Sequence, residues 1–566
     1  MLHGTAASEG IGIGKVMLIE EHSLEYTPRT VTDTEAESQR FKTAVDAFCY
    51  NTEKQAENLR SSAGEKEAEI LAGHIQIIRD PYLSGEIEKL IADGQCAESA
   101  LEHMCDMFIA MFSAADDELT KQRAADVRDI KSGVLGILLG VNEIKVSDAP
   151  KGTVLVAREL TPSVTAGIVK ENIAGIITET GGTTSHSAIL ARALEIPAVL
   201  SVEGVASSLK NGDTVVVDGS EGAVIVNPDD NTVAEYSKKR DAFLAERKEL
   251  ENYRGRETKS ASGEAYELFC NIGKPEDAVK AVDADGEGVG LFRTEFLFMD
   301  RTSIPTEDEQ FDAYKKAALI LKGKSLIIRT LDIGGDKDIP YLGLEKEENP
   351  FMGFRAIRYC LKNRELFKSQ IKAILRASAF GDVKIMFPLI TTMDELREGK
   401  KLVAECKADL RNMGINFNEN IQVGVMVETA SAAVIADMLA KEADFFSIGT
   451  NDLTGYTMAC DRGNNDVSYL YSPLQPSVLR MIKRTIECGV QNGISVGMCG
   501  EAAANKLMIP LLISFGLTEF SVSAPSVLNV RKIISTWTKE EADKVTAKVL
   551  EMSIQQEIVE YLKSVV

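Results

Sequence analysis

Hydrophobic positions change their spacing several times along the chain, and each change predicts a different kind of structure. At the start, EGIGIGKVMLIEE alternates apolar residues with glycines, which predicts a pair of strands. We do not interpret its GIGIG as a phosphate-binding loop, because the strand-then-helix context and the full spacing are missing. From about residue 30 to residue 141, apolar side chains recur every three or four positions, which predicts a bundle of four or so helices.

Between residues 142 and 228 the pattern shortens to β-branched runs such as TVLVA, IAGIIT and TVVVD, separated by Gly, Asn and Asp. One helical stretch, SHSAILARALE, lies among these runs. Together they predict a small α/β domain that also includes residues 1–20, so that the helices of 21–141 form an insertion. A charged helical segment at 229–259 carries one heptad-spaced apolar stripe, and we interpret it as a linker helix.

The remaining chain, residues 260–566, alternates apolar runs with helical segments. Eight such runs over about 300 residues predict a (β/α)8 TIM barrel, whose active site lies at the C-terminal ends of the strands. The runs are ELFCNIG, GVGLFRTE, SLIIRTLD, VKIMFPLI, QVGVMVE, DFFSIGTND, ISVGMCGE and EFSVSA.

Composition narrows the function classes. The 566 residues include 63 basic and 86 acidic side chains, and the net charge of −23 argues against nucleic-acid binding. The nine cysteines form no CxxC pair, which is typical of reduced thiols in the cytoplasm. No apolar run approaches the roughly 20 residues that cross a membrane, and we see no signal peptide, so we expect a cytoplasmic protein without membrane contact.

The predicted barrel strands end in polar side chains of both signs. Each alone is compatible with a structural salt bridge, but so many charges at one rim need partners. Arginine suits phosphate and carboxylate oxygens, and two carboxylates suit Mg²⁺ that is completed by substrate oxygens. We therefore expect a small phosphorylated carboxylic acid to bind with Mg²⁺ near Arg293, Arg329, Lys337, Arg355, Glu428, Asn451, Asp452, Arg462 and Cys499.

All five histidines lie in the first 186 residues, so the predicted barrel has none. The segment ETGGTTSHSAILARALE follows a predicted strand and places His186 at the start of a helix, where exposed N–H groups favour an anion. This position suits an imidazole that acquires a phosphoryl group, with Thr183, Thr184 and Ser185 as donors to its oxygens. A capped loop with an incidental histidine is the structural alternative.

GGTTSHSAILARALEIPA resembles the phosphohistidine motif of the phosphoenolpyruvate-utilising enzymes. EGVGLFRTEFLFMDR, RTLDIGGDK, EENPFMGFRAIR, GVMVET, FFSIGTNDLTGYTMACDRGN and VGMCGE resemble that family's barrel motifs. With the helical insertion, the whole chain is similar to the Enzyme I family of the bacterial sugar phosphotransferase system. This resemblance implies that His186 takes a phosphoryl group from phosphoenolpyruvate, that pyruvate is released, and that a small histidine-containing carrier protein (HPr) then receives the group.

The same resemblance implies roles for individual residues. Cys499 matches the acid that protonates the pyruvate enolate, and a thiol pKa near the working pH would suit that role. Thr165 and Arg192 match positions beside the active histidine. The substrate positions are Arg293, Arg329, Lys337, Arg355, Asn451 and Arg462, and the Mg²⁺ positions are Glu428 and Asp452. The family also implies that the helical insertion docks the carrier and that the barrel forms a homodimer.

Several positions depart from the family's usual pattern. Thr183 replaces an arginine, Ala430 a proline and Gly455 a glutamine, and GEAAAN differs from the more common GELAGD. None of them removes an atom assigned above to the metal or to phosphoryl transfer. Two alternative functions stay open. Another phosphoenolpyruvate enzyme, such as a dikinase, needs an ATP-binding domain for which no motif appears, and a non-catalytic signalling paralogue would not need the intact site.

Overall fold

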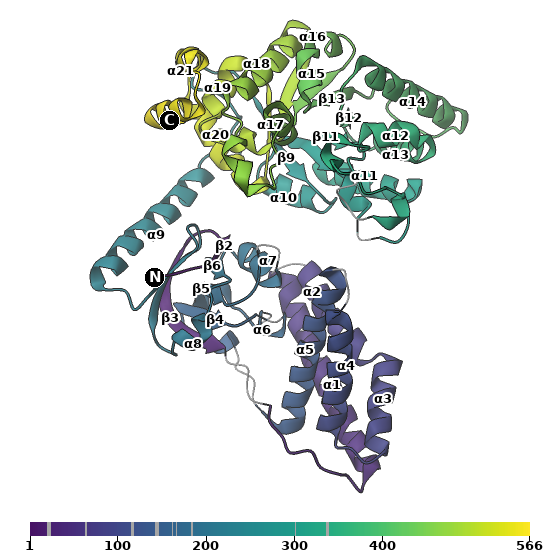
Figure 1. Ribbon diagram of the computed structural model, residues 1–566, viewed down its shortest axis with the longest axis vertical. Coiled ribbons are helices and arrows are strands. Elements are labelled where there is room, and N and C mark those ends of the chain that lie inside the picture. The colour runs from purple at the N-terminus through teal and green to yellow at the C-terminus, as the bar shows by residue number, and fades with distance from the viewer. Residues whose placement is uncertain are drawn as a thin grey trace. The chain divides into compact units, whose positions relative to one another are not determined.

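The computed structural model describes residues 1–19, 24–62, 65–114, 118–141, 146–160, 162–165, 167–182, 185–299, 301–334 and 339–566. Within these ranges the chain forms two compact units, Met1–Arg247 and Lys248–Val566. Each unit is described by itself below (Figure 1).

An eight-stranded sheet organises the α/β part of the first unit. Its strand order is β1-β8-β7-β3-β4-β5-β6-β2, in which β3, β4, β5 and β6 run parallel. The first three strands therefore share a sheet with strands from beyond residue 150. The strands are β1 (Leu2–His3), β2 (Thr5–Ser8), β3 (Ile11–Ile19), β4 (Thr153–Ala157), β5 (Ile173–Thr178), β6 (Ala198–Leu200), β7 (Thr214–Asp218) and β8 (Ala223–Val226).

The glycine-rich N-terminal run is a strand, as predicted, and its glycines serve close packing. A Cβ on Gly12 would lie 2.0 Å from the carbonyl oxygen of Ala174, and one on Gly14 would lie 2.0 Å from that of Gly152. Only glycine lets the backbones approach so closely. The GIGIG sequence thus builds the sheet and is not a phosphate-binding loop.

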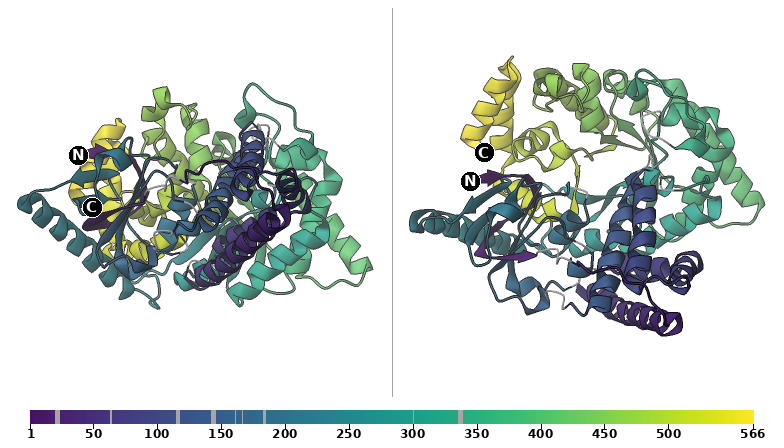
Figure 2. Two further views of the ribbon diagram at one scale, coloured as in Figure 1. Left: turned by 90° about the horizontal axis from the view of Figure 1, so that it is seen from below. Right: turned by 60° about the horizontal axis from the view of Figure 1, so that its bottom comes forward.

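Five helices lie side by side between β3 and β4 in the chain, one more than the approximate number expected (Figures 1 and 2). His74 is buried on α2, and its ring nitrogens lie 3.4 Å from Asp126 and 3.7 Å from Asp129 on α5, so this histidine is packed and hydrogen-bonded between the two helices. Asp80 caps the next helix by accepting from the amides of Tyr82 and Leu83. The helices are α1 (Thr34–Ser62), α2 (Glu65–Ile78), α3 (Pro81–Ala92), α4 (Ala97–Ser113) and α5 (Glu118–Leu139).

The rest of the first unit contains short helices around the sheet and one long helix, α9 (Asp230–Glu251), as expected for the linker segment. None of its residues is buried, and the two compact units divide within it. Phe243 on this helix lies close to Gly10 at the edge of the sheet. The short helices are α6 (Pro162–Thr165), α7 (His186–Ala193) and α8 (Val205–Ser208).

The second unit is a closed barrel of eight parallel strands, which confirms the predicted (β/α)8 fold. All eight sequence runs became strands, and the last, β16, pairs with the first, β9. A parallel barrel places every strand's carboxyl end on the same rim. The strands are β9 (Glu267–Ile272), β10 (Gly288–Arg293), β11 (Ser325–Arg329), β12 (Val383–Phe387), β13 (Val423–Val427), β14 (Phe445–Ile448), β15 (Ser495–Met498) and β16 (Glu519–Val522).

Helices surround this barrel, and several begin at strong local signals. Thr306, Thr392 and Thr538 each form a capping box with the glutamate three residues on. Most of the helices follow strands as the sequence predicts. They are α10 (Asp277–Asp283), α11 (Glu307–Leu321), α12 (Ile357–Lys362), α13 (Arg364–Ala377), α14 (Met393–Asn412), α15 (Ala430–Val434), α16 (Ala436–Leu439), α17 (Thr450–Met458), α18 (Pro476–Gln491), α19 (Ile509–Phe515), α20 (Val527–Thr536), α21 (Lys539–Glu551) and α22 (Gln555–Val565).

In the part of the chain that the structure describes, no helix combines the length and the low polarity needed to cross a bilayer.

Candidate functional site

The candidate site lies at the carboxyl rim of the barrel, where chain topology gathers the predicted residues. Arg293 and Arg329 are the last residues of β10 and β11. Glu428 directly follows β13, and Cys499 directly follows β15. Asp452 lies in the first turn of α17, just after β14.

A buried ion-pair network connects two of the predicted arginines. Nη1 of Arg329 lies 2.9 Å from Oδ2 of Asp332, and Nη2 of Arg355 lies 2.7 Å from Oδ1 of the same carboxylate. Arg329 also pairs with Glu295, and Arg355 lies 3.3 Å from Asp452. Asp332 thus bridges two buried arginines.

This network keeps both arginines charged. Burial alone would lower the pKa of Arg329, but Glu295 and Asp332 raise it above its ordinary value. Burial likewise opposes the charge of Arg355, and Asp332 and Asp452 raise its pKa. Two fixed positive charges therefore face the rim, where an anionic ligand would compete for them with carboxylates of the protein.

Glu428 places a buried carboxyl group in the same region. Its side chain is 2% exposed, and Oε1 accepts a hydrogen bond of 2.7 Å from the amide of Leu389. Leu389 takes the positive φ of 54° at this point, a conformation that non-glycine residues adopt at a cost. A Cβ on Gly449 would lie 2.7 Å from Oε2 of Glu428, so glycine leaves room for the carboxylate beside the turn that leads to Asp452.

Burial, and then the nearby Asp452 and Asp332, raise the pKa of Glu428 well above its usual range. A cation would relieve this repulsion, and two carboxylates with room for substrate oxygens and water match the way Mg²⁺ binds. No three His, Cys, Asp or Glu side chains among the described residues form a ready-made metal site.

Cys499 is 4% exposed, and its amide donates to the carbonyl oxygen of Ile448 on β14 over 3.2 Å. Its side chain belongs to a layer of buried residues inside the barrel. Burial raises the pKa of this thiol to about 11, although Arg329 and Arg293 oppose the shift. The sequence led us to expect a thiol pKa near the working pH, and burial raises it above the ordinary value of a cysteine. The apolar layer keeps the proton on sulfur, which suits a proton donor.

The other predicted barrel residues differ in how exposed they are. Arg293 and Arg462 are exposed, and Asn451 is half-buried on the first turn of α17. The backbone oxygen of Asn451 accepts a 3.0 Å hydrogen bond from the hydroxyl of Tyr471. Lys337 lies outside the described residues.

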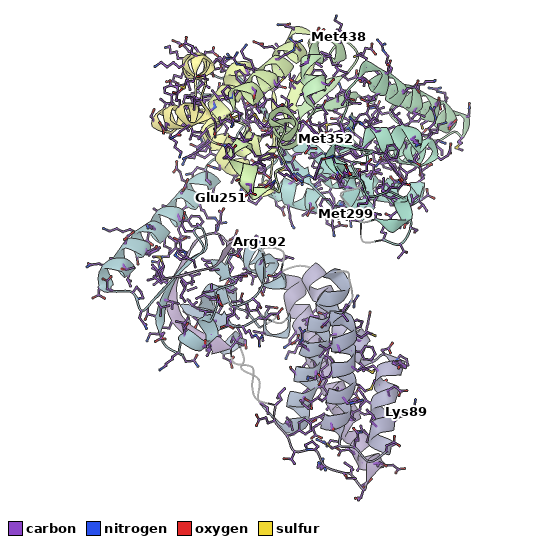
Figure 3. All side chains as sticks on the ribbon, in the orientation of Figure 1. Lys89, Arg192, Glu251, Met299, Met352 and Met438 are labelled. Carbon is purple, nitrogen blue, oxygen red and sulfur yellow. The ribbon has the colours of Figure 1, made fainter. Side chains whose placement is uncertain are left out.

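Sequence reasoning missed one tyrosine of this site. The hydroxyl of Tyr456 accepts a 3.4 Å hydrogen bond from Nη1 of Arg355 and donates to the carbonyl of Phe351. Phe351 belongs to the short 3-10 helix Pro350–Met352, whose Met352 is labelled in Figure 3. Tyr456 lies four residues after Asp452 on α17, so a helical-face argument could have found it.

A second group of predicted residues lies in the first unit, around α7. Ser185 is the N-cap of this helix, and its hydroxyl accepts from the amide of Ala188 over 3.3 Å. His186 is the first helical residue, as predicted, and its side chain lies outside what the structure describes. Gly181 has φ of 106°, which requires glycine in the turn before the helix. Thr183 and Thr184 lie outside the described residues.

Thr165 and Arg192 are both near this helix in the fold. Thr165 is buried at the end of α6, a helix that packs against α7. Arg192 stands in the last turn of α7, and its Nη1 donates to the carbonyl oxygen of Ala7 on β2 over 3.0 Å (Figure 3). This contact ties α7 to the edge strand of the sheet.

Comparisons with known proteins place this fold and site in a class. The PEP-binding domain of the PEP-utilising enzymes matches residues 247–538, their N-terminal domain matches 3–123, and their mobile domain matches 149–222. The fold is thus that of the phosphoenolpyruvate-utilising enzymes.

Curated relatives narrow the class further. The phosphoenolpyruvate-protein phosphotransferase of Bacillus subtilis is 47% identical over 99% of this chain and 99% of that protein. That of Listeria innocua is 45% identical over 99% of this chain and 98% of its own length. A solution structure of Enzyme I (nEIt) is 38% identical, covers 43% of this chain and all of its own, and has a TM-score of 0.39. This chain belongs to the phosphoenolpyruvate-protein phosphotransferase family, also called Enzyme I.

Proposed function

We propose that this chain transfers the phosphoryl group of phosphoenolpyruvate to His186 and then to a histidine of a small carrier protein, HPr. One observation carries the proposal. The barrel rim of a chain from this family holds two buried arginines that share Asp332, beside a buried glutamate that burial and its carboxylate neighbours destabilise as an anion.

The arginines bind and orient the substrate. Arg329 and Arg355 present planar, permanently charged donors in a buried setting, where such contacts are strong. Arg293, Asn451, Arg462 and Lys337 complete the set that we assign to the phosphate and carboxylate of phosphoenolpyruvate. Positioning and charge neutralisation then do most of the catalysis, as is usual for phosphoryl transfer.

Glu428 and Asp452 would hold Mg²⁺. When bound, the ion supplies positive charge to the oxygens of the transferring phosphoryl group. The chain's own contribution is to fix the two carboxylates. The amide of Leu389 anchors Glu428, and Arg355 holds Asp452 from the opposite side.

Cys499 would complete the substrate half of the reaction. When the bond between the phosphorus and the enol oxygen breaks, the phosphoryl group passes to a ring nitrogen of His186, and the enolate of pyruvate remains. The methylene carbon of that enolate takes the proton from Sγ of Cys499, which gives pyruvate, and water then reprotonates the thiolate. A thiol that burial keeps protonated matches this order of events.

In the first unit, Ser185 caps the helix whose first residue is His186, and the cap fixes the position of the His186 backbone. We assign Thr165, Thr183, Thr184, Ser185 and Arg192 to the support of the phosphorylated ring. Free N–H groups in the first turn of a helix favour the phosphoryl charge.

The carrier would dock on the helices α1–α5. Exposed apolar side chains gather on α3 and α4, where Tyr82, Met107 and Met111 are 61%, 45% and 56% exposed. Tyr82 contacts Phe108 edge-on, with 6.3 Å between ring centroids. A cluster of exposed methionine and aromatic side chains is typical of a protein-binding surface. Glu65, Glu67 and Glu69 on α2 would add negative charge that suits a basic carrier, and their side chains lie outside the described part.

One histidine must reach both the barrel rim and the carrier, so we propose a swivel. The domains would be residues 1–20 with 142–228, the inserted helices 21–141, a linker helix 229–259 and the barrel 260–566. The division of the two compact units within α9 supports a hinge near that helix.

We also propose that two copies associate through the barrel and that the reaction takes place in the cytosol. Exposed apolar residues on the barrel's outer helices, Val434 and Met438, support an interface, and Met438 is labelled in Figure 3. All nine cysteines are described, and none forms a disulfide, which fits a reducing compartment. Light scattering at several concentrations tests the dimer, and a constant monomer mass would contradict it.

The proposed function is tested with phosphoenolpyruvate labelled in its phosphoryl group and with Mg²⁺, without nucleotide. We expect acid-labile label on the protein, its loss in His186→Ala, and its passage to added HPr. His103→Ala is the matched control, because His103 is exposed on α4 and lies outside the proposed chemistry. An unlabelled protein would favour a signalling paralogue, and label that requires a nucleotide would favour a dikinase.

A further inference from the structure

A small polar cluster inside the barrel is not explained by the residues assigned so far. Asn271 on β9 donates from Nδ2 to the carbonyl oxygen of Cys499 over 3.0 Å and to that of Ser521 over 3.2 Å. Its Oδ1 accepts a hydrogen bond of 2.7 Å from the hydroxyl of Ser521 on β16. Ser521 is fully buried, so these are interior contacts rather than solvent-facing ones.

The cluster reaches Cys499 across a neighbouring strand. β9 and β15 are not paired, because β16 lies between them. The β15–β16 ladder runs only through Gly497 and Met498, so the carbonyl of Cys499 lies just beyond it. Within the described residues, the side chain of Asn271 supplies the hydrogen bond that this carbonyl accepts.

Cys499 is thereby held from two sides. Its amide donates to Ile448 on β14, and its carbonyl accepts from Asn271 on β9. The side-chain amide of Asn271 is itself fixed, because two carbonyls face its nitrogen and the hydroxyl of Ser521 faces its oxygen. The side chain of Cys499 belongs to a buried cluster with Leu291, Ile327, Met386, Met426 and Phe445.

We propose that Asn271 and Ser521 are positioning residues for the Cys499 thiol and fix the face of the pyruvate enolate that receives its proton. This inference rests on the proposed function, in which the S–H bond of Cys499 breaks and a C–H bond forms at the methylene carbon. The main chain of Cys499 is held on both sides, and its Sγ donates to the carbonyl oxygen of Ile448 over 3.8 Å and packs in an apolar layer, so the thiol delivers its proton from one direction. If the carbonyl of Cys499 loses its hydrogen bond, the thiol is no longer fixed. Water then protonates the enolate, and it does so on both faces.

Two variants remove hydrogen bonds of this cluster while changing the size of the side chain little. Asn271→Asp keeps the shape of the side chain but loses the Nδ2 donor, and Ser521→Ala loses only the hydroxyl that orients it. Ser325→Ala is the matched control, since Ser325 begins barrel strand β11 and its buried hydroxyl has no hydrogen-bond partner within the described ranges. Thermal melts establish that each variant is folded, and Ser521→Ala is the milder change if Asn271→Asp fails to fold.

The readout is the stereochemistry of the product. Phosphoenolpyruvate carries tritium stereospecifically at one of the two hydrogens of its methylene carbon. It is turned over in deuterated water with HPr as acceptor, and the chirality of the pyruvate methyl group is measured. We expect one chirality from the unaltered chain and from Ser325→Ala, and a nearly racemic methyl group from Cys499→Ala. Asn271→Asp and Ser521→Ala should lose most of the chirality and form pyruvate about tenfold more slowly.

The inference would be overturned if both folded variants gave a methyl group of the same chirality as the unaltered chain. Label on His186 in that experiment would still support the proposed phosphoryl transfer. A mere loss of stability would slow turnover without changing the chirality, and it would also overturn a positioning role. A racemic product from the unaltered chain would overturn this inference together with the proton-donor role of Cys499.

Discussion

Buried charge is the dominant feature of this protein at the scale of single residues. Asp332 accepts from two guanidinium groups and is itself 8% exposed, so its charge is desolvated and fully engaged. Removing one member of such a network costs far more than the network contributes as a whole, because the remaining charges stay buried without a partner.

We predict that Asp332→Asn lowers the free energy of unfolding by about 3 kcal/mol, because Arg329 and Arg355 lose their shared counter-charge. Denaturant titration of the purified chain measures the change. The control is Asp437→Asn, which breaks an ion pair with Arg484 whose side chains are 48% and 46% exposed. That change should cost less than about 1 kcal/mol, and equal costs for the two variants would contradict the argument.

A second buried carboxyl lies deeper in the barrel, away from the assigned site residues. Glu519 begins β16 and is 5% exposed, and a Cβ on Gly497 would lie 2.8 Å from its Oε1. Burial and the neighbouring Glu267 raise the pKa of Glu519 to about 8, against the opposing charge of Lys384. Because the folded state binds this proton more tightly than the unfolded chain does, stability falls as pH rises from about 4.5 to about 8.

We therefore predict that Glu519→Gln stabilises the barrel at pH 8.5 by a few kcal/mol and has little effect at pH 5, since the amide needs no proton. Melting temperatures across this range measure the effect. Glu551→Gln on α21, which is exposed, should leave the pH profile unchanged. A gain for Glu519→Gln that is the same at both pH values would show that its proton is not linked to folding.

At the scale of elements, the turns after the strands determine where the functional side chains stand. Gly500 follows Cys499, and a Cβ there would lie 1.8 Å from Oγ1 of Thr450 and 2.8 Å from its amide nitrogen. Thr450 is the first residue of α17, the helix whose first turn carries Asn451 and Asp452. Contact between two turns, rather than either turn alone, positions these residues.

We predict that Gly500→Ala displaces the start of α17 and raises the Mg²⁺ concentration needed for half-maximal pyruvate formation at least about tenfold. Titration of activity with Mg²⁺ measures this effect in a variant that remains folded. The control is Gly85→Ala within α3, where a Cβ meets no atom within 4 Å. It should keep the Mg²⁺ dependence and stabilise the helix by roughly 0.5–1 kcal/mol. An unchanged Mg²⁺ dependence in Gly500→Ala would refute this account.

At the scale of the whole molecule, the chemistry is divided between two compact units. The barrel unit contains every described residue that we assign to substrate, metal and proton transfer, and the other unit contains His186. The barrel has no histidine, so it cannot accept the phosphoryl group on an imidazole of its own. The two half-reactions therefore separate along the chain.

We predict that a chain ending at Arg247 folds and exchanges phosphoryl groups with phosphorylated HPr, but takes up no label from phosphoenolpyruvate. Circular dichroism checks folding, and acid-labile labelling checks both reactions. Addition of the barrel unit as a separate chain should restore only slow labelling, because the joining helix no longer keeps the two units together. Direct labelling of the shortened chain by phosphoenolpyruvate would contradict the division.

The sequence by itself determined the elements and most of the assigned site. All eight barrel strands and the strands after residue 150 were predicted, because β-branched runs between turn residues depend on local pattern. Glu428, Asp452, Cys499 and the arginines at strand ends were predicted because parallel topology brings those ends together. His186 at a capped helix start followed from Ser185 and the glycines before it.

Only the tertiary structure decided which ion pairs and hydrogen bonds these residues form and how deeply they are buried. The Arg355–Asp332 ion pair, the contact of Tyr456 with Arg355 and the hydrogen bond of Asn271 to Cys499 join positions 23 to 228 residues apart in the chain. The raised pKa of the Cys499 thiol, which sequence reasoning expected near the working pH, comes from burial in a layer formed by several strands. Desolvation and long-range hydrogen bonds depend on what packs around a group, and no local spacing encodes that.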